Sequence, residues 1–124
     1  MEYYLTFAAG DGGMQKIIDP SPETIEWAIE SLIPVEDYFV ILESEEPVDN
    51  CMFVQTLVPQ YYEIEIDYMI EVRFEYDGYH KQYRIFEDNI DVLKKMFRMY
   101  ALKILPDVTG WEDITEKVAK ASKT

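Results

Sequence analysis

The most regular pattern along the chain is a strict alternation of apolar and polar side chains from residue 62 to residue 77. Successive side chains of a β-strand point to opposite faces of a sheet, so this pattern predicts a strand with one apolar and one polar face. A straight strand of that length would span about 50 Å, whereas a domain of this size has a radius of gyration of about 14 Å. We therefore expect the strand to curve strongly or to break near residues 67–69.

The dipeptide Asp77-Gly78 follows the alternating stretch and is typical of a two-residue turn in a β-hairpin. Such a turn determines the register of the two strands that it joins. The predicted cross-strand pairs are Tyr76 with Tyr79, Phe74 with Lys81, Val72 with Tyr83, Ile70 with Ile85, Glu75 with His80, and Glu71 with Arg84. The last pair places a carboxylate opposite a guanidinium, which is a favourable arrangement.

The N-terminal part of the chain predicts a hairpin followed by a helix. Residues 2–18 contain two strand-like runs around the glycine-rich residues 10–13, which suit a tight turn. A helix over residues 22–33 should follow, with Ser21 as its N-cap and Pro22 at its first position. Its apolar stripe consists of Ile25, Ile29 and Leu32.

Further elements follow from apolar runs and from helix signals. Residues 38–43 and 51–58 predict two strands, joined by a loop over residues 45–50. A second helix is expected over residues 89–104, capped by Asp88. Its apolar stripe would consist of Ile90, Leu93, Phe97, Tyr100 and Ile104.

These elements together predict one α+β domain over residues 1–124. The N-terminal hairpin and the strands within residues 38–86 would form a single antiparallel sheet of about six strands. The two helices would pack on one face of that sheet. Residues 105–124 are expected to form a C-terminal tail that contains one short helical turn.

The charge of the chain narrows the class of its partners. The formal net charge is −14, and residues 1–50 contain twelve acids but a single base, Lys16. Such a charge opposes binding to nucleic-acid phosphates and to anionic membranes, and it favours a basic partner whose approach is steered electrostatically.

Several kinds of catalytic and metal site are disfavoured by the residue types. The chain contains one cysteine and one histidine, Cys51 and His80, so it cannot build a zinc site of the Cys/His kind. Cys51 has no basic neighbour in the sequence and is expected to be a buried small apolar residue. We therefore predict that the protein is not an enzyme and that it needs no cofactor or metal. The single cysteine, and the lack of a signal peptide or an apolar run long enough to span a membrane, predict a cytoplasmic protein.

The polar face of the alternating strand is the main candidate for a binding surface. Side chains on one face of a strand repeat about every 6.6 Å, which resembles the spacing of phosphates along a nucleic-acid strand, so such a row could occupy the basic channel of a nuclease. The acids on this face are Glu63, Glu65, Asp67, Glu71, Glu75 and Asp77. Trp111, which lies between Gly110 and two acids, is a second candidate for partner binding if its side chain is exposed. In the alternative interpretation, Trp111 packs against the last helix.

The order of these elements resembles a known family. The capped helix that starts at Pro20-Ser21-Pro22-Glu23, the strand Tyr38–Glu43, the hairpin Glu75–Arg84, the helix with Phe97 and Tyr100, and the late Trp111 are similar to the small immunity proteins of bacterial polymorphic-toxin systems. Among these immunity proteins of contact-dependent inhibition systems, the order of elements is most similar to that of the first-described immunity family. The resemblance covers roughly residues 20–113 and implies that the chain binds and blocks a cognate toxin domain, often a nuclease.

The leading hypothesis is thus an inhibitor that neutralises a basic toxin domain through an acidic sheet face. Two alternatives remain open. One is a small ligand-binding or enzymatic domain with a buried carboxylate in a pocket between sheet and helices. The other is a subunit of a homo-oligomer that uses the long strand as a sheet edge.

Overall fold

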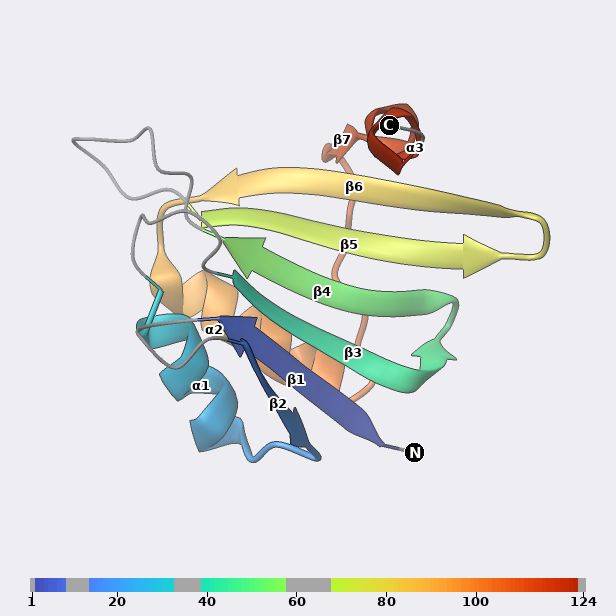
Figure 1. Cartoon of the computed structure of the whole chain (residues 1–124). Coiled ribbons are helices and arrows are strands. Elements are labelled where there is room, and N and C mark those ends of the chain that lie inside the picture. Colours follow the sequence, from blue (N-terminus) through green and yellow to red (C-terminus); the bar gives the residue numbers. More distant parts are fainter. Residues whose placement is uncertain (1, 9–13, 33–38, 58–67, 123–124) are drawn as a thin grey trace.

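The computed structural model describes residues 2–8, 14–32, 39–57 and 68–122. Seven strands form one antiparallel sheet in the order β2-β1-β3-β4-β5-β6-β7 (Figure 1). The strands are β1 (Tyr3–Ala8), β2 (Met14–Ile18), β3 (Phe39–Val48), β4 (Cys51–Leu57), β5 (Tyr68–Tyr76), β6 (Tyr79–Glu87) and β7 (Glu112–Asp113). The helices are α1 (Pro22–Glu30), α2 (Ile90–Ala101) and α3 (Thr115–Ser122). The predicted α+β class with a single antiparallel sheet is confirmed.

Helices α1 and α2 pack on the same face of the sheet. The Trp27 ring of α1 contacts Phe7 edge-on, and the Tyr100 ring of α2 contacts Tyr3 in the same way. Tyr3 and Phe7 are both odd-numbered positions of β1 and therefore point to one face. The opposite face of the sheet carries no helix from this pair and is called the open face below.

The core lies between these two helices and the sheet. Each central strand contributes alternate side chains to it, and α1 and α2 contribute one stripe each. The fully buried apolar side chains include Leu5, Phe7, Ile25, Ile29, Val40, Leu42, Val54, Ile70, Val72, Leu93, Phe97 and Tyr100. Ile104, predicted as part of the second stripe, is instead 45% exposed. It lies beyond α2, because the chain leaves the helix at Lys103 with a left-handed φ of 67° and Ile104 N donates to Met99 O.

The β5–β6 hairpin has the register that the Asp77-Gly78 turn predicts. All six expected pairs are present, including Tyr76 with Tyr79 and Glu71 with Arg84. Gly78 has a φ of 84°, a left-handed conformation that favours glycine. The first part of the long alternating stretch, with its expected bend, lies outside the described residues, which omit 58–67. The described part is an interior strand.

Two boundaries in the first half differ from those that the sequence predicts. Strand β3 continues to Val48 instead of giving way to a loop at residue 45. A two-residue turn then follows, in which Asp49 and Asn50 both have left-handed φ angles, 45° and 72°. These are the residue types that tolerate such a turn. Helix α1 begins as predicted, because Ser21 Oγ accepts a hydrogen bond from Thr24 N at 3.2 Å. It ends at Glu30, however, and not at residue 33.

The second helix and the C-terminal segment also need correction. Asn89, and not Asp88, caps α2 by accepting a hydrogen bond from Asp91 N at 2.9 Å. The predicted tail contains the short strand β7, which pairs with β6, and the helix α3. Ile114 lies between them and is fully buried, and its N–H donates to Gln82 O at 2.9 Å. The segment is thus attached to the sheet edge.

Candidate partner-binding surface

Glu71, a candidate binding residue, is buried on the open face. Its side chain is 7% exposed, and four donors surround the carboxylate. Oε1 accepts from Gln55 Nε2 at 2.9 Å and from Gln82 Nε2 at 2.7 Å. Oε2 accepts from Arg84 Nε at 3.2 Å and Nη2 at 3.1 Å. The expectation that Glu71 projects into solvent is therefore wrong, since its charge is already neutralised by Arg84.

The other candidates on the long strand have different surroundings. Glu75 is half-exposed, and its Oε1 accepts from Arg73 Nε at 2.7 Å. Asp77 is exposed in the turn at the tip of the β5–β6 hairpin. Glu63, Glu65 and Asp67 lie outside the described residues. Among the described members of the proposed acidic row, Asp77 is thus the exposed acid that forms no ion pair.

Trp111 is partly buried and packs against the hydrophobic core. It follows Gly110, which has a φ of 85°, and its N–H donates to Val108 O at 3.0 Å. These contacts fit the alternative in which the indole closes one end of the core. They leave a smaller surface for a partner than a fully exposed indole would offer.

The topology brings a different set of acids together at one end of the sheet. In an antiparallel sheet, the β3–β4 turn and the β5–β6 turn lie at the same end, where β1 also begins and β2 finishes (Figure 1). Backbone hydrogen bonds link these segments: Glu45 N donates to Glu2 O, and Glu75 N donates to Asn50 O, both at 2.8 Å. We call this region the hairpin end.

Six exposed acids occupy the hairpin end, and none of them takes part in an ion pair within the described residues. They are Glu2, Asp19, Glu45, Glu46, Asp49 and Asp77. Five of the six come from residues 1–50, the segment whose acid excess the sequence displays. The sequence analysis did not select them, because their proximity depends on strand order.

Most of the described ion pairs lie away from the hairpin end, and Lys16 lies over the Tyr4 ring, 4.6 Å from its centroid. Lys94 and Arg98 of α2 pair with Glu30 and Glu26 of α1. Lys81 pairs with Asp113, and Lys117 pairs with Glu112, both beside β7. The hairpin end thus gathers six acids outside the described ion pairs from separate segments of the chain. The other described acids outside an ion pair are Glu23, Glu43, Glu87, Asp88, Asp91, Asp107 and Glu116.

Acids of the hairpin end raise the pKa of the Tyr4 phenol. Its hydroxyl donates to Glu2 Oε2 at 3.0 Å, and this hydrogen bond is the main cause of a raised pKa for the Tyr4 phenol. Burial adds to the rise, and the charges of Glu2, Glu45 and Asp19 add further. Carboxylates from three separate segments therefore lie close enough to Tyr4 to act on one side chain.

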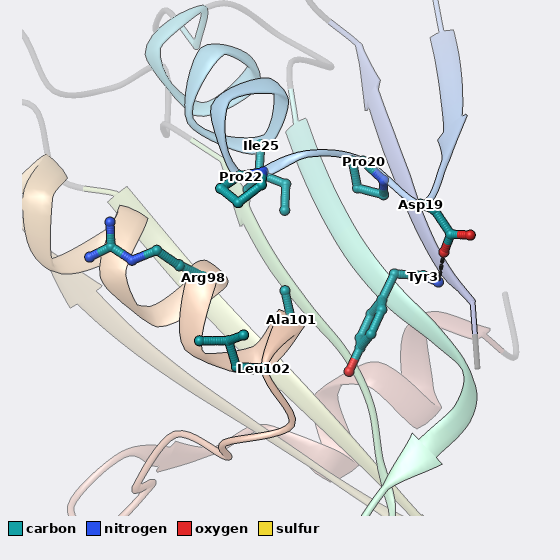
Figure 2. A pocket seen from close by; sticks show the side chains of 8 residues that line it. All are labelled: Tyr3, Asp19, Pro20, Pro22, Ile25, Arg98, Ala101 and Leu102. Carbon is teal, nitrogen blue, oxygen red and sulfur yellow. Dashed lines mark hydrogen bonds between the residues drawn. The ribbon is translucent and has the colours of Figure 1, made fainter.

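A cavity of about 320 Å³ lies between the start of α1, the end of α2 and β1 (Figure 2). Its wall is mostly apolar and includes Pro22, Ile25, Ala101 and Leu102. The acid that lines it, Asp19, is exposed and accepts a hydrogen bond from Tyr3 N at 3.1 Å. The cavity thus lacks the buried carboxylate that the ligand-binding alternative requires.

The described residues offer little for catalysis or for metal binding. Cys51 is fully buried, as predicted, and burial raises the pKa of its thiol to about 12, so it is not an activated nucleophile. Within the described ranges there is no group of three or more potential ligands that could hold a metal ion. None of the described helices is long and apolar enough to span a membrane.

The long strand is not positioned as the third hypothesis expects. β5 lies in the interior of the sheet, with β4 on one side and β6 on the other. Its backbone groups are therefore paired on both sides, so the described part of this strand cannot serve as an edge for self-association. The two edge strands are β2 and the two-residue β7.

Comparisons with known proteins give no relative for this chain: no family model, curated protein or solved structure matches it.

Proposed function

We propose that this protein binds a basic protein partner and acts as an inhibitor, in the manner of an immunity protein that neutralises a toxin domain. The observation that supports this proposal most directly is the hairpin end, with six exposed acids that no described ion pair compensates. Holding like charges together in this way costs stability unless a cationic partner offsets the repulsion.

The surface has the properties expected of a fast electrostatic inhibitor. Exposed acids outside an ion pair are free to steer a cationic partner during approach. They come from turns and strand ends, so they form one broad surface instead of the single row along a strand that the sequence suggests. In this proposal Glu75 and Asp77 remain binding residues, Glu71 becomes a structural residue, and Trp111 supports the core.

The inhibitor would work in the cytoplasm, where it would meet a toxin domain that enters or is made there. No catalytic step is assigned to the protein itself, and no cofactor is required. The partner to test is a basic C-terminal domain of a protein encoded next to this chain.

The test is the rate of association with that domain, measured by stopped-flow fluorescence at several salt concentrations. Neutralising Glu45 and Glu46 together, as Glu45→Gln and Glu46→Gln, should slow association several-fold at low salt and flatten its salt dependence. Asp88→Asn with Asp91→Asn is the matched control, because it removes the same charge at the start of α2, on the opposite end of the sheet. The proposal is wrong if the domain fails to bind, or if both pairs of substitutions slow association equally.

A further inference from the structure

A ladder of aromatic rings leads from the core to the tip of the β5–β6 hairpin. Phe74 contacts Tyr83 edge-on, with 6.1 Å between ring centroids, and stacks on Tyr76 at 6.4 Å. Tyr76 in turn stacks on Tyr79 across the hairpin, with centroids 4.8 Å apart and planes inclined by 18°. All four rings belong to one face of the hairpin, since Tyr76 pairs with Tyr79, and Phe74 and Tyr83 occupy alternate positions of the same two strands.

The outer two rings of this ladder are exposed. Phe74 is 8% exposed, whereas Tyr76 is 37% and Tyr79 is 57% exposed. The hairpin tip extends beyond the neighbouring β3–β4 turn (Figure 1), so a partner can reach these rings without contacting the helices. A tight turn holds both strands at this point, which fixes the rings in place before any partner arrives.

Acids lie close to the tyrosine pair. Asp77 lies in the turn between the two tyrosines, whereas Glu75 precedes Tyr76 on the same strand, points to the other face and pairs with Arg73. Asp49 belongs to the adjacent turn, whose Asn50 O accepts a hydrogen bond from Glu75 N. The site therefore combines exposed tyrosine rings, stacked in a row that ends at Tyr79, with the carboxylates of Asp77 and Asp49, and this combination is complementary to a planar cation.

We propose that Tyr76 and Tyr79 anchor an arginine side chain of the basic partner, with Asp77 as the carboxylate that its guanidinium pairs with. This inference rests on the proposed function and adds the residue type that the hairpin tip recognises. Arginine suits the site better than lysine, because its planar guanidinium stacks on aromatic rings and pairs with a carboxylate in the same geometry. Tyrosine and arginine are also the residues that most often dominate the energy of protein interfaces.

The probes for the test are a tetra-arginine and a tetra-lysine peptide of equal charge, titrated into the full chain by calorimetry and by NMR of the tyrosine ring protons. The tetra-arginine peptide should bind more tightly, and it should shift the ring signals of Tyr76 and Tyr79. Tyr79→Ala should weaken its binding about two- to fivefold, the size of an exposed cation–π contact. Tyr79→Phe, which keeps the ring, should retain the affinity.

Phe86→Ala is the matched control, because Phe86 is 44% exposed and lies at the other end of β6. None of these variants changes the net charge, so general attraction to the acidic surface is constant throughout. Equal binding to the wild type, Tyr79→Ala and a second variant, Tyr76→Ala, overturns the arginine anchor. If the double variant Glu45→Gln and Glu46→Gln still weakens binding in that case, the acidic surface binds the cationic peptide and the proposed function is retained without the arginine anchor. If neither peptide binds the wild type at low salt, the anchor and the proposed function both fail.

Discussion

Arg84 holds Glu71 by one carboxylate oxygen, with its Nε and Nη2 atoms 3.2 and 3.1 Å from Oε2. The other oxygen, Oε1, is occupied by the amides of Gln55 and Gln82. Four donors from the two neighbouring strands, β4 and β6, thus converge on one acid in the middle of the open face. This arrangement makes Glu71 a structural residue and gives the first of four predictions.

Replacing Glu71 with alanine should lower the free energy of unfolding by about 2–4 kcal/mol, because the buried Gln82 amide loses its partner and Arg84 loses its counter-charge. Glu75→Ala is the matched control on the same strand and face. Its pair with Arg73 is half-exposed, so its loss should cost less than about 1 kcal/mol. Urea denaturation measures both, and equal losses would contradict a structural role for Glu71.

Stability should fall as the pH rises from about 9 towards 12. Burial raises the pKa of the Cys51 thiol from 9.0 to about 12, and burial is also the main cause of a raised pKa for the Tyr100 phenol. Above pH 9 the unfolded chain releases the thiol proton while the folded chain retains it, so unfolding becomes more favourable. Each group adds up to about 1.4 kcal/mol per pH unit.

The substitution Cys51→Ala removes one of these two groups. Its free energy of unfolding should therefore decline less steeply between pH 9 and 12 than that of the wild type, when both are followed by urea denaturation at each pH. In the native wild type, the thiol should react with a disulfide reagent at pH 8 far more slowly than in urea. Rapid reaction of the folded protein would show that Cys51 is accessible.

Tyr100→Phe should lower stability by about 1–2 kcal/mol, because the hydroxyl donates to Cys51 O at 2.9 Å inside the core. Tyr3→Phe removes a longer bond, 3.2 Å to Tyr100 O, at a partly exposed position. Its effect should be smaller, and thermal unfolding distinguishes the two. If Tyr3→Phe destabilises the protein more than Tyr100→Phe does, the hydrogen bond of the Tyr100 hydroxyl is not the more stabilising of the two.

The turn between β3 and β4 can be tested through Asn50, whose φ is 72°. Asn50→Gly should leave stability unchanged or raise it slightly, since glycine adopts this conformation without strain. Asn50→Val should cost about 1–2 kcal/mol, because a β-branched residue in the left-handed region is strained. If chemical denaturation gives Asn50→Val the same stability as Asn50→Gly, the backbone at Asn50 does not adopt a left-handed conformation.

Local signals in the sequence predict the parts of this fold that depend on short-range geometry. Asp77-Gly78 predicts every pair of the β5–β6 hairpin, and Ser21 predicts the start of α1, because turns and caps are decided by neighbouring residues. The same reasoning fails for β3, where Glu45-Glu46-Pro47 has the composition of a loop. The strand continues through it because the pairing of β3 with β4 is irregular between Glu43 and Val48, as in a β-bulge, where exposed polar residues and proline are tolerated.

The candidate surface depends on long-range geometry, and the sequence therefore predicts it less well. Alternation correctly places Glu71 on the face opposite the core and opposite Arg84. It does not indicate that Gln55 and Gln82 surround the same carboxylate, since Gln55 belongs to another strand. The grouping of Glu2 and Asp49 with Asp77 likewise requires the strand order. What the sequence does predict is the excess of acids in residues 1–50, from which five of the six exposed acids come.

The order of the strands has a consequence for how the protein folds. From β3 to β6, each strand lies beside its neighbour in the sequence, and tight two-residue turns close two of the three connections. Pairing of this kind requires little loop closure, so the meander can assemble early and quickly. The N-terminal hairpin and the C-terminal segment then add to its two sides. An acidic surface made of the meander's own turns would therefore be present as soon as the central strands pair, before the chain has finished folding.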